Sequence, residues 1–296
     1  MKILILGAGG MLGSTLFRLL PEYGNNDVYG TLRQSKEDAT LAGAFTKSEN
    51  LICNIDVMNI DQLSQTILQL NPNVIINCVG IIKQLDISDD PLYMIPINSL
   101  LPFRISKLAE RVGARLIHIS TDCVFDGKKG SYLESDKPNA DDLYGKSKEL
   151  GEVKDRSHVL TLRTSLIGHE LQSNHSLVDW FLNQKDKVQG YTKAVFSGLT
   201  TVEMAKVIHN KILSQANRSG LYHLSVNPIS KFDLLNLVKR FYNKKIEIIP
   251  TDTITIDRSL IGKRFNDDFN YEPPGWEDLI LELKVYYDKF KGKDHV

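Results

Sequence analysis

A tyrosine and a lysine stand four residues apart in the stretch DDLYGKSKELGE, residues 141–152. In a helix, this spacing places Tyr144 and Lys148 on one face, about one turn apart. A free phenol, with a pKa of about 10, donates protons inefficiently at neutral pH, and a nearby ammonium that stabilises the phenolate lowers that pKa. The pair is therefore either a general acid with the cation that activates it, or an ordinary surface tyrosine and lysine.

Glycines recur in the stretch LILGAGGMLGSTL, directly after the first residues of the chain. Their spacing permits a tight turn, close approach of the backbone to a pyrophosphate, and a helix whose first N–H groups bind the anion. We interpret the stretch as the loop of a dinucleotide site, with a turn needed only for packing as the alternative. The residues expected to line this loop are Gly7, Gly10, Met11, Leu12 and Gly13.

The choice of cofactor depends on the end of the second apolar run, which reads GTLRQS. NAD enzymes usually carry an acid here for the ribose hydroxyls, whereas this chain offers Arg33, whose guanidinium suits a 2′-phosphate. The sequence therefore favours NADP(H), with NAD(H) still possible and a solvated Arg33 as the alternative. Asp56 and Val57 follow the run LICNI, where Asp56 is expected either to contact the adenine or to cap the next helix.

Short apolar runs alternate with helical patterns through the first part of the chain. This alternation is typical of a parallel sheet covered by helices on both faces. We predict the fold class α/β, with a Rossmann-type doubly wound parallel sheet as the NAD(P)-binding domain over residues 1–165. A smaller C-terminal substrate-binding lobe is expected at about residues 166–190 and 225–296, with part of 190–225 returning to the first domain.

Composition excludes several partner classes. Thirty-six basic residues balance thirty-six acidic ones, so nothing calls for nucleic acid or an anionic membrane, and a small molecule is the better default. No run approaches a membrane span, and the N-terminus does not read as a signal peptide, so we expect a cytoplasmic protein. The cysteines at 53, 78 and 123 are odd in number and lack ligand spacing, so they are expected to be reduced and structural, with no metal site.

Four motifs carry a family resemblance: GAGGMLG at 7–13, NCVG at 77–80, STDCVFDG at 120–127 and YGKSK at 144–148. With them the chain resembles the extended short-chain dehydrogenase/reductases, and within these the dTDP-4-dehydrorhamnose reductase group. The resemblance covers essentially the whole chain. It implies a hydride transfer to a ketone, in which Tyr144 protonates the forming alkoxide and Lys148 also binds the nicotinamide ribose.

The resemblance implies further site residues. Thr121, rather than its neighbour Ser120, would hydrogen-bond the substrate carbonyl, and Cys78, Val79 and Gly80 would line the cofactor. Asn98 falls where relatives keep an active-site asparagine, with a polar helix residue of no catalytic duty as the alternative. The substrate would meet the residues Lys83, Asp122, Phe125, Asp126 and Arg258, the last in a basic segment that also holds Lys263 and Arg264.

Departures from the group pattern limit the substrate that can be named. The chain has RTSL with Leu166 where the group has RTSW, FSGLT at 196–200 where it has QxGxPT, and Lys83 where a tyrosine is expected. We therefore predict an NADPH-dependent oxidoreductase that reduces a nucleotide-linked 4-keto-6-deoxy sugar for surface polysaccharide synthesis, with a homodimer as a possible assembly. The alternatives are an epimerase or dehydratase of the same superfamily and a non-catalytic NADP-binding regulatory subunit.

Overall fold

A seven-stranded parallel sheet forms the centre of the protein, in a computed structural model that describes residues 1–35, 45, 48–83 and 85–291. The strand order is β3-β2-β1-β4-β5-β6-β11, the doubly wound order in which direction reverses between β1 and β4. The predicted Rossmann-type fold is confirmed. The strands are β1 (Lys2–Leu6), β2 (Asp27–Thr31), β3 (Leu51–Ile52), β4 (Val74–Asn77), β5 (Arg115–Thr121), β6 (Val159–Thr164) and β11 (Gly220–His223).

Alternation along the central strands explains the two helical layers. In β1, Ile3 and Ile5 pack into one apolar cluster with Leu16 of the first helix, whereas Leu4 and Leu6 pack into a second cluster. Successive side chains of a strand point to opposite faces, so a strand of five apolar or partly apolar residues is buried from both sides. The continuous runs that predict these strands thus follow from burial on two faces.

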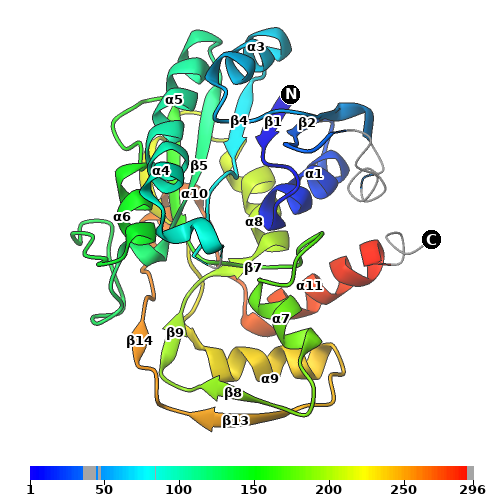
Figure 1. The fold of residues 1–296 in the computed structure, drawn as a ribbon, viewed down its shortest axis with the longest axis vertical. Coiled ribbons are helices and arrows are strands. Elements are labelled where there is room, and N and C mark those ends of the chain that lie inside the picture. The colour runs from blue at the N-terminus through cyan, green and yellow to red at the C-terminus, as the bar shows by residue number, and fades with distance from the viewer. Residues whose placement is uncertain (36–44, 46–47, 84, 292–296) are drawn as a thin grey trace.

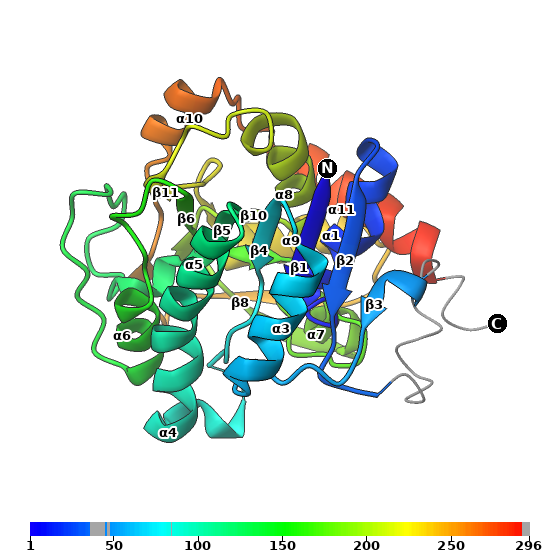
Figure 2. The same ribbon diagram turned by 90° about the horizontal axis from the view of Figure 1, so that it is seen from above.

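Helices cover both faces of the sheet, as Figure 2 shows from above. One layer consists of α1 (Met11–Tyr23), α8 (Thr201–Val207) with the π-helical turn Ile208–Ile212, and α11 (Trp276–Lys291). The other consists of α3 (Ile60–Leu70), α4 (Pro91–Met94), the π-helical turn Ile95–Leu100, α5 (Leu101–Arg111) and α6 (Leu143–Leu150). Short 3₁₀ turns lie at Ser48–Asn50, Asp86–Asp89 and Asp122–Val124.

A smaller group of elements lies below the sheet in Figure 1. It contains parallel β8 (Lys187–Tyr191) and β13 (Glu247–Thr251), and β9 (Ala194–Phe196) between β12 (Ile229–Ser230) and β14 (Ile256–Asp257). Strands β7 (Leu166–Ile167) and β10 (Leu199–Thr200) pair beside it, and the helices here are α7 (Leu177–Asn183) and α9 (Lys231–Phe241). Helix α10 (Lys263–Phe269) packs instead beside β11 of the large sheet. Between α8 and β12 the chain returns to the large sheet as β11, which pairs with β6. The domain limits stay a prediction.

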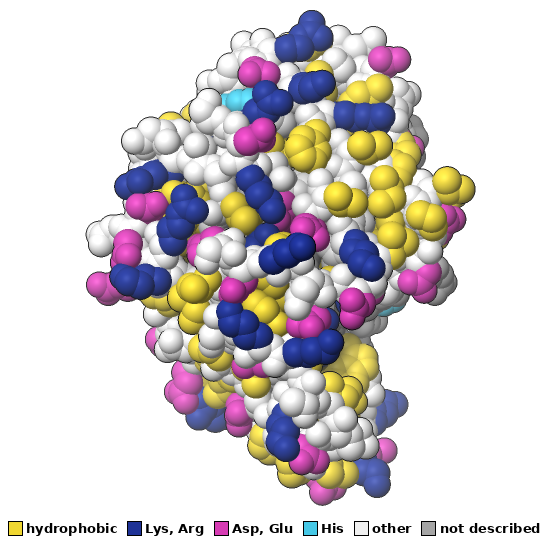
Figure 3. Space-filling model, turned by 90° about the vertical axis from the view of Figure 1, so that its left-hand side faces the viewer, with side chains coloured by type: hydrophobic (Ala, Val, Ile, Leu, Met, Phe, Trp, Pro, Cys, Tyr) yellow, Lys and Arg dark blue, Asp and Glu magenta, His cyan; other side chains and the backbone are white. Residues whose placement is uncertain are grey.

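The surface carries charges of both signs. On the face shown in Figure 3, the Lys and Arg side chains are interspersed with Asp and Glu, and hydrophobic side chains gather in one area. Within the described residues, none of the helices has the length and apolar character needed to cross a membrane.

Candidate active site

The glycine loop between β1 and α1 is shaped by contacts that only glycine allows. Gly7 has a φ of +83°, and its amide donates a hydrogen bond to Thr31 Oγ1 at 3.1 Å. A Cβ added to Gly13 would lie 2.1 Å from the carbonyl oxygen of Gly7. Among the described side chains none caps the first turn of α1, so the N–H groups of Met11, Leu12 and Gly13 can face an anion. This loop fits the pyrophosphate of a dinucleotide.

The structure places Arg33 at the neighbouring strand end. Arg33 is exposed and lies two residues beyond Thr31, the residue that anchors the glycine loop. Segment 36–44 follows, outside the described residues. Because the carboxyl ends of β1 and β2 lie side by side, a guanidinium at this position is within the region where the adenosine end of a dinucleotide binds.

Asp56 does not cap the helix that follows it, so this alternative from the sequence is wrong. The N-cap of α3 is Asn59, whose side chain accepts a hydrogen bond from the Gln62 amide at 3.1 Å. Asp56 is exposed and its carboxylate accepts from the Met58 amide at 2.9 Å, which holds the loop beyond β3. Its neighbour Val57 packs against the apolar cluster beneath.

A second loop faces the first across the switch point of the sheet. After β4, the Val79 amide donates to Asn77 Oδ1 at 3.1 Å, and Val79 Cγ2 lies 3.0 Å from the position of a Cβ on Gly7. Cys78 joins the strand ends, because its amide donates to the Leu6 carbonyl at 3.1 Å. A Cβ on Gly80 would stand 3.9 Å from Lys148 Nζ. Two predicted cofactor segments and the predicted lysine therefore meet at this edge.

Asn98 fastens this second loop to helix α6. It is buried in the π-helical turn, where its Oδ1 accepts from the Ile81 amide at 2.9 Å. Its Nδ2 donates to the Ile81 carbonyl at 3.0 Å and to Ser147 Oγ at 3.2 Å. These contacts make Asn98 a support for the loop beyond β4.

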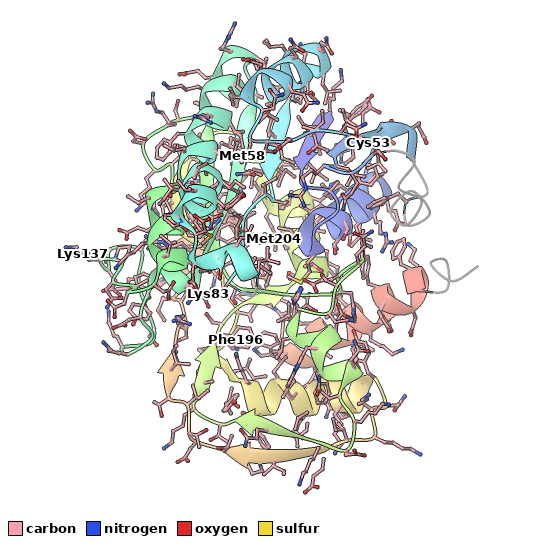
Figure 4. The ribbon with its side chains drawn as sticks, in the orientation of Figure 1. Cys53, Met58, Lys83, Lys137, Phe196 and Met204 are labelled. Carbon is pink, nitrogen blue, oxygen red and sulfur yellow. The ribbon has the colours of Figure 1, made fainter. Side chains whose placement is uncertain are left out.

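Helix α6 carries Tyr144 and Lys148 on one side. It begins because Asp142, the N-cap, accepts from the Gly145 amide at 2.8 Å. A Cβ on Gly145 would lie 2.4 Å from the Cys123 carbonyl oxygen, so glycine lets α6 approach the loop after β5 closely. Lys83 Nζ lies 2.6 Å from Asp142 Oδ2 and 5.7 Å from the centre of the Tyr144 ring. Figure 4 shows Lys83 between the sheet and the smaller group of elements that contains Phe196.

Burial, more than charge, sets the protonation of the pair. Burial raises the pKa of Tyr144, with the nearby Cys123 adding to the increase and a hydrogen bond to Thr121 opposing it. Lys148 is not among the described groups that shift this pKa, so the activation of Tyr144 by the ammonium stays a prediction. Burial also lowers the pKa of Lys148 to about 8, against the opposing charge of Glu152. Lys148 Nζ donates to the Ile119 carbonyl at 2.7 Å.

Thr121 and Ser120 point their hydroxyls to different partners. Thr121 lies at the end of β5, where its Oγ1 accepts from the Cys123 amide at 3.1 Å and lies 3.2 Å from Asp122 Oδ1. Ser120 Oγ donates to the buried Glu152 at 2.9 Å. The hydrogen bond between Thr121 and Tyr144 brings these two predicted residues together. Ser120 instead binds a carboxylate inside the protein.

The loop after β5 holds the predicted substrate residues at different depths. Phe125 is fully buried and stacks on Tyr132 with ring centres 4.0 Å apart, so its ring shapes the loop instead of facing solvent. The Phe125 carbonyl accepts from Arg258 Nε at 2.9 Å. Burial raises the pKa of Asp122, and the charge of Arg258 opposes this. Asp126 accepts from the Tyr132 hydroxyl at 2.9 Å and so braces the same loop.

The basic segment at 258–264 does not act as one cluster. Arg258 faces the loop after β5, but Lys263 pairs with Asp267 at 2.8 Å on the surface of α10. Arg264 donates to the Leu221 carbonyl at 3.0 Å and lies over the Tyr222 ring. Of the three, Arg258 alone contacts the predicted substrate loop in the described structure.

Comparison with known proteins identifies the family. The family model described as RmlD substrate binding domain matches residues 1–259. The chain belongs to this family. A dTDP-4-dehydrorhamnose reductase of Aggregatibacter actinomycetemcomitans is 25% identical over 313 residues, which cover 96% of this chain and 99% of that protein. The resemblance predicted from the four motifs is therefore confirmed.

One solved structure and one further relative are also similar to this RmlD-family chain. The crystal structure of dTDP-4-dehydrorhamnose reductase from Bacillus anthracis in complex with NADP has a TM-score of 0.77 at 22% identity, covering 96% of this chain and 99% of that one. Methionine adenosyltransferase 2 subunit beta of Bos taurus is 30% identical over 151 residues, 51% of this chain and 41% of that protein. The first likeness shows the fold, and the second covers about half of the chain.

Sequence reasoning missed several groups that this RmlD-family site contains. Cys123 stands beside Tyr144, and burial raises the pKa of its thiol to about 12, so it stays protonated at neutral pH. Asp142 links Lys83 to the start of α6. Glu152 was identifiable from its spacing, because it follows Lys148 by four residues as Lys148 follows Tyr144. Among the described residues, no His, Cys, Asp and Glu side chains gather in a group that could hold a metal ion.

Proposed function

We propose that this protein is an NADPH-dependent reductase of a nucleotide-linked 4-keto-6-deoxy sugar, serving deoxysugar or surface polysaccharide synthesis. One observation carries the proposal. A protonated phenol, Tyr144, and a hydroxyl, Thr121, stand together at the carboxyl edge of a doubly wound sheet, opposite a glycine loop shaped for a pyrophosphate. Membership of the RmlD family supports the same reaction.

The chain's own residues would act on the substrate carbonyl as a donor pair. Bound NADPH supplies the hydride for the ketone. Thr121 orients the carbonyl through a hydrogen bond, and Tyr144 protonates its oxygen as negative charge develops. Tyr144 is protonated at neutral pH, because burial raises its pKa. Lys148 holds a positive charge one helical turn away, which stabilises the phenolate left after the proton has gone.

NADP(H) is the cofactor that the described residues fit better. The loop at 7–13 and the segment Cys78, Val79 and Gly80 would hold the pyrophosphate and nicotinamide ends, and Lys148 the ribose between them. Arg33 would bind the 2′-phosphate, and Asp56 and Val57 would border the adenine. The relative crystallised with NADP supports this choice, while NAD(H) remains possible.

Substrate recognition falls to residues between the sheet and the smaller group of elements, which we propose as the substrate-binding lobe. Arg258 would engage the diphosphate, because its guanidinium already lies beside the substrate loop and matches paired phosphate oxygens. Lys83 and Asp122 would contact the sugar. The other two motif departures meet at one strand pair, in which Leu166 of β7 stands in register with Leu199 of β10.

A regulatory subunit is the second candidate, favoured by one observation. The likeness to methionine adenosyltransferase 2 subunit beta reaches 30% identity over half of the chain. Such a protein would bind NADP without turnover, and the presence of Thr121, Tyr144 and Lys148 together weighs against it.

The decisive experiment measures loss of NADPH absorbance with a panel of nucleotide-linked 4-keto-6-deoxy sugars. A reductase consumes one NADPH for each sugar reduced, whereas an epimerase or dehydratase regenerates its nicotinamide and a regulatory subunit consumes none. Tyr144→Phe is the matched inactive control. Absence of NADPH consumption with every sugar, in protein that binds NADPH, would exclude the reductase.

Assembly and compartment complete the proposal. We propose a homodimer, for which the exposed apolar residues Leu92, Tyr93, Leu100 and Phe103 on α4, the π-helical turn and α5 offer a contact face. Light scattering measures the mass, and a monomer would exclude the dimer. A cytoplasmic location agrees with the free cysteines of the described structure.

A further inference from the structure

A buried carboxylate, Glu152, lies beneath the catalytic residues and collects four donors. Arg163 binds it with both Nε and Nη2, at 2.6 and 2.8 Å. Ser120 Oγ donates at 2.9 Å, and Lys154 Nζ lies 2.8 Å away. Glu152 and Arg163 are almost completely inaccessible to solvent, in contrast to Lys154. Charges so buried are costly, and this pair is held in one geometry by donors from two strands.

Glu152 is also the charged neighbour of Lys148. The groups that act on or lie beside this ammonium are Cys78 after β4, His118 on β5, Tyr144 on α6 and Glu152 just beyond the end of α6. Arg163 and Lys154 pair with Glu152. Burial raises the pKa of Cys78 to about 12 and holds the pKa of His118 well below its usual value, so both are neutral at pH 7. Of the described groups that raise the pKa of Lys148, Glu152 is therefore the one that carries a negative charge at neutral pH.

Arg163 extends the same support to the substrate loop. Its guanidinium lies 5.1 Å from the centre of the Phe125 ring, and its Nη1 is 3.3 Å from His223 Nε2. His223 Nδ1 in turn lies 3.1 Å from the Tyr132 carbonyl oxygen, and Tyr132 stacks on Phe125. The loop that presents Thr121, Asp122 and the Arg258 contact therefore rests on a guanidinium fixed by Glu152.

We propose that Glu152 is a positioning residue of the reaction: its carboxylate, four residues beyond Lys148, supports that ammonium and holds Arg163 under the Phe125–Tyr132 loop. This inference rests on the proposed reductase function. It assigns to one buried anion the support of both the ammonium and the substrate loop.

The electrostatic part of the inference has a definite sign. Burial holds the pKa of Lys148 at about 8, and Glu152 opposes that decrease. Without the Glu152 carboxylate, burial lowers the pKa of Lys148 further, so Lys148 loses its proton at a lower pH. Tyr144 has a raised pKa, so Lys148 deprotonates first as pH rises. The alkaline decline of NADPH binding and of kcat/KM therefore reports Lys148.

The test compares Glu152→Gln, Glu152→Asp and Arg163→Gln with the unchanged protein from about pH 6 to about pH 10, a window that brackets the pKa of Lys148. NADPH affinity, measured by fluorescence titration, gives a readout independent of turnover. We expect Glu152→Gln to move the alkaline midpoint down by at least about one pH unit, and Glu152→Asp to restore most of that shift. Arg163→Gln removes a cation and keeps the anion, so its midpoint should not fall, although its KM for the sugar nucleotide should rise.

Asp179→Asn is the matched control for damage to a buried carboxylate. Asp179 lies in the smaller group of elements, where it binds His169 and the Glu170 amide. This variant should lower the thermal midpoint of unfolding without moving the alkaline midpoint. If Glu152→Gln fails to fold because Arg163 is left unpaired, the double variant Glu152→Gln/Arg163→Gln takes its place and should shift the midpoint in the same direction.

An unchanged alkaline midpoint in folded Glu152→Gln protein, or in the double variant, overturns the inference. Equal downward shifts in Glu152→Gln and Arg163→Gln also overturn it, because they would indicate general structural damage. Failure of the proposed function is distinct: the unchanged protein would then consume no NADPH with any sugar, although the pH dependence of NADPH binding could still be compared among the variants.

Discussion

The carboxyl edge of the seven-stranded sheet and the smaller group of elements hold their residues differently. At the sheet edge, Gly13 has no room for a side chain, and Asn98 and Lys148 are buried with fixed partners. In the smaller group, β13 is exposed along most of its length, and several strands are only two residues long. The proposed chemistry thus lies on the rigid region and the proposed recognition on the less constrained one.

This difference suggests where substrate choice can change without loss of the reaction. The departures Leu166 and the segment 196–200 both fall outside the large sheet, on or beside the β7–β10 pair. The glycine loop and the Tyr144–Lys148 helix match the family motifs. Substitutions in the two regions should therefore affect different kinetic constants.

The largest effect is expected at the sheet edge. Tyr144→Phe removes the proton donor and keeps the ring, so kcat should fall at least ~100-fold while NADPH still binds. Stopped assays of NADPH consumption and a fluorescence titration measure the two quantities. Tyr93→Phe, at a half-exposed tyrosine on α4, is the matched control and should be fully active. Full activity of Tyr144→Phe would show that the proton donor is not at this edge of the sheet.

Arg33 tests the cofactor end of the same edge. If it binds the 2′-phosphate, Arg33→Ala should weaken NADPH by ~1–3 kcal/mol and leave NADH nearly unchanged, since a charge-assisted contact is lost for NADPH alone. Calorimetric titration with both cofactors measures the difference. Equal losses would mean that Arg33 acts on packing or on the adenine.

Arg258 tests the recognition region. Arg258→Ala should raise the KM for the sugar nucleotide at least about tenfold, which corresponds to about 1.4 kcal/mol, without changing NADPH affinity. Arg264→Ala is the matched control, because Arg264 lies in the same segment but donates to the Leu221 carbonyl. A normal KM in the first variant, or a loss of NADPH affinity, would place the diphosphate elsewhere.

The smallest effect is expected on the exposed strand β13. Ile249 is 39% exposed there, so Ile249→Thr should change the free energy of unfolding by no more than about 0.5 kcal/mol and leave both kinetic constants intact. Urea unfolding and steady-state assays measure this. A large loss of turnover would contradict the separation of the two regions.

The features that the sequence predicts well are those dictated locally. Glycine at 7 and 13 is required by backbone conformation and close approach, and buried parallel strands need continuous apolar runs. The sequence therefore indicates the loop, the sheet and the Tyr–Lys helix without knowledge of tertiary contacts.

The features that it predicts poorly depend on packing between distant segments. The raised pKa of Tyr144 comes from burial that several elements create, and the side chain of Phe125 is hidden by Tyr132 and Arg163. The helix cap that the sequence offered at Asp56 lies three residues later, at Asn59. The contact of Arg163 with His223 joins residues sixty positions apart, which no local pattern signals.

Strand β11 imposes an order of events on a chain that is still being synthesised. The other six strands of the sheet are complete once residue 164 has been made, and β6 then forms an open edge of unpaired N–H and C=O groups. Gly220–His223 covers that edge only after β7 to β10, α7 and α8 have emerged. During this interval, Arg163 lacks its His223 contact and the β6 edge is open to pairing with other chains, which makes it the point at which a nascent chain most needs protection.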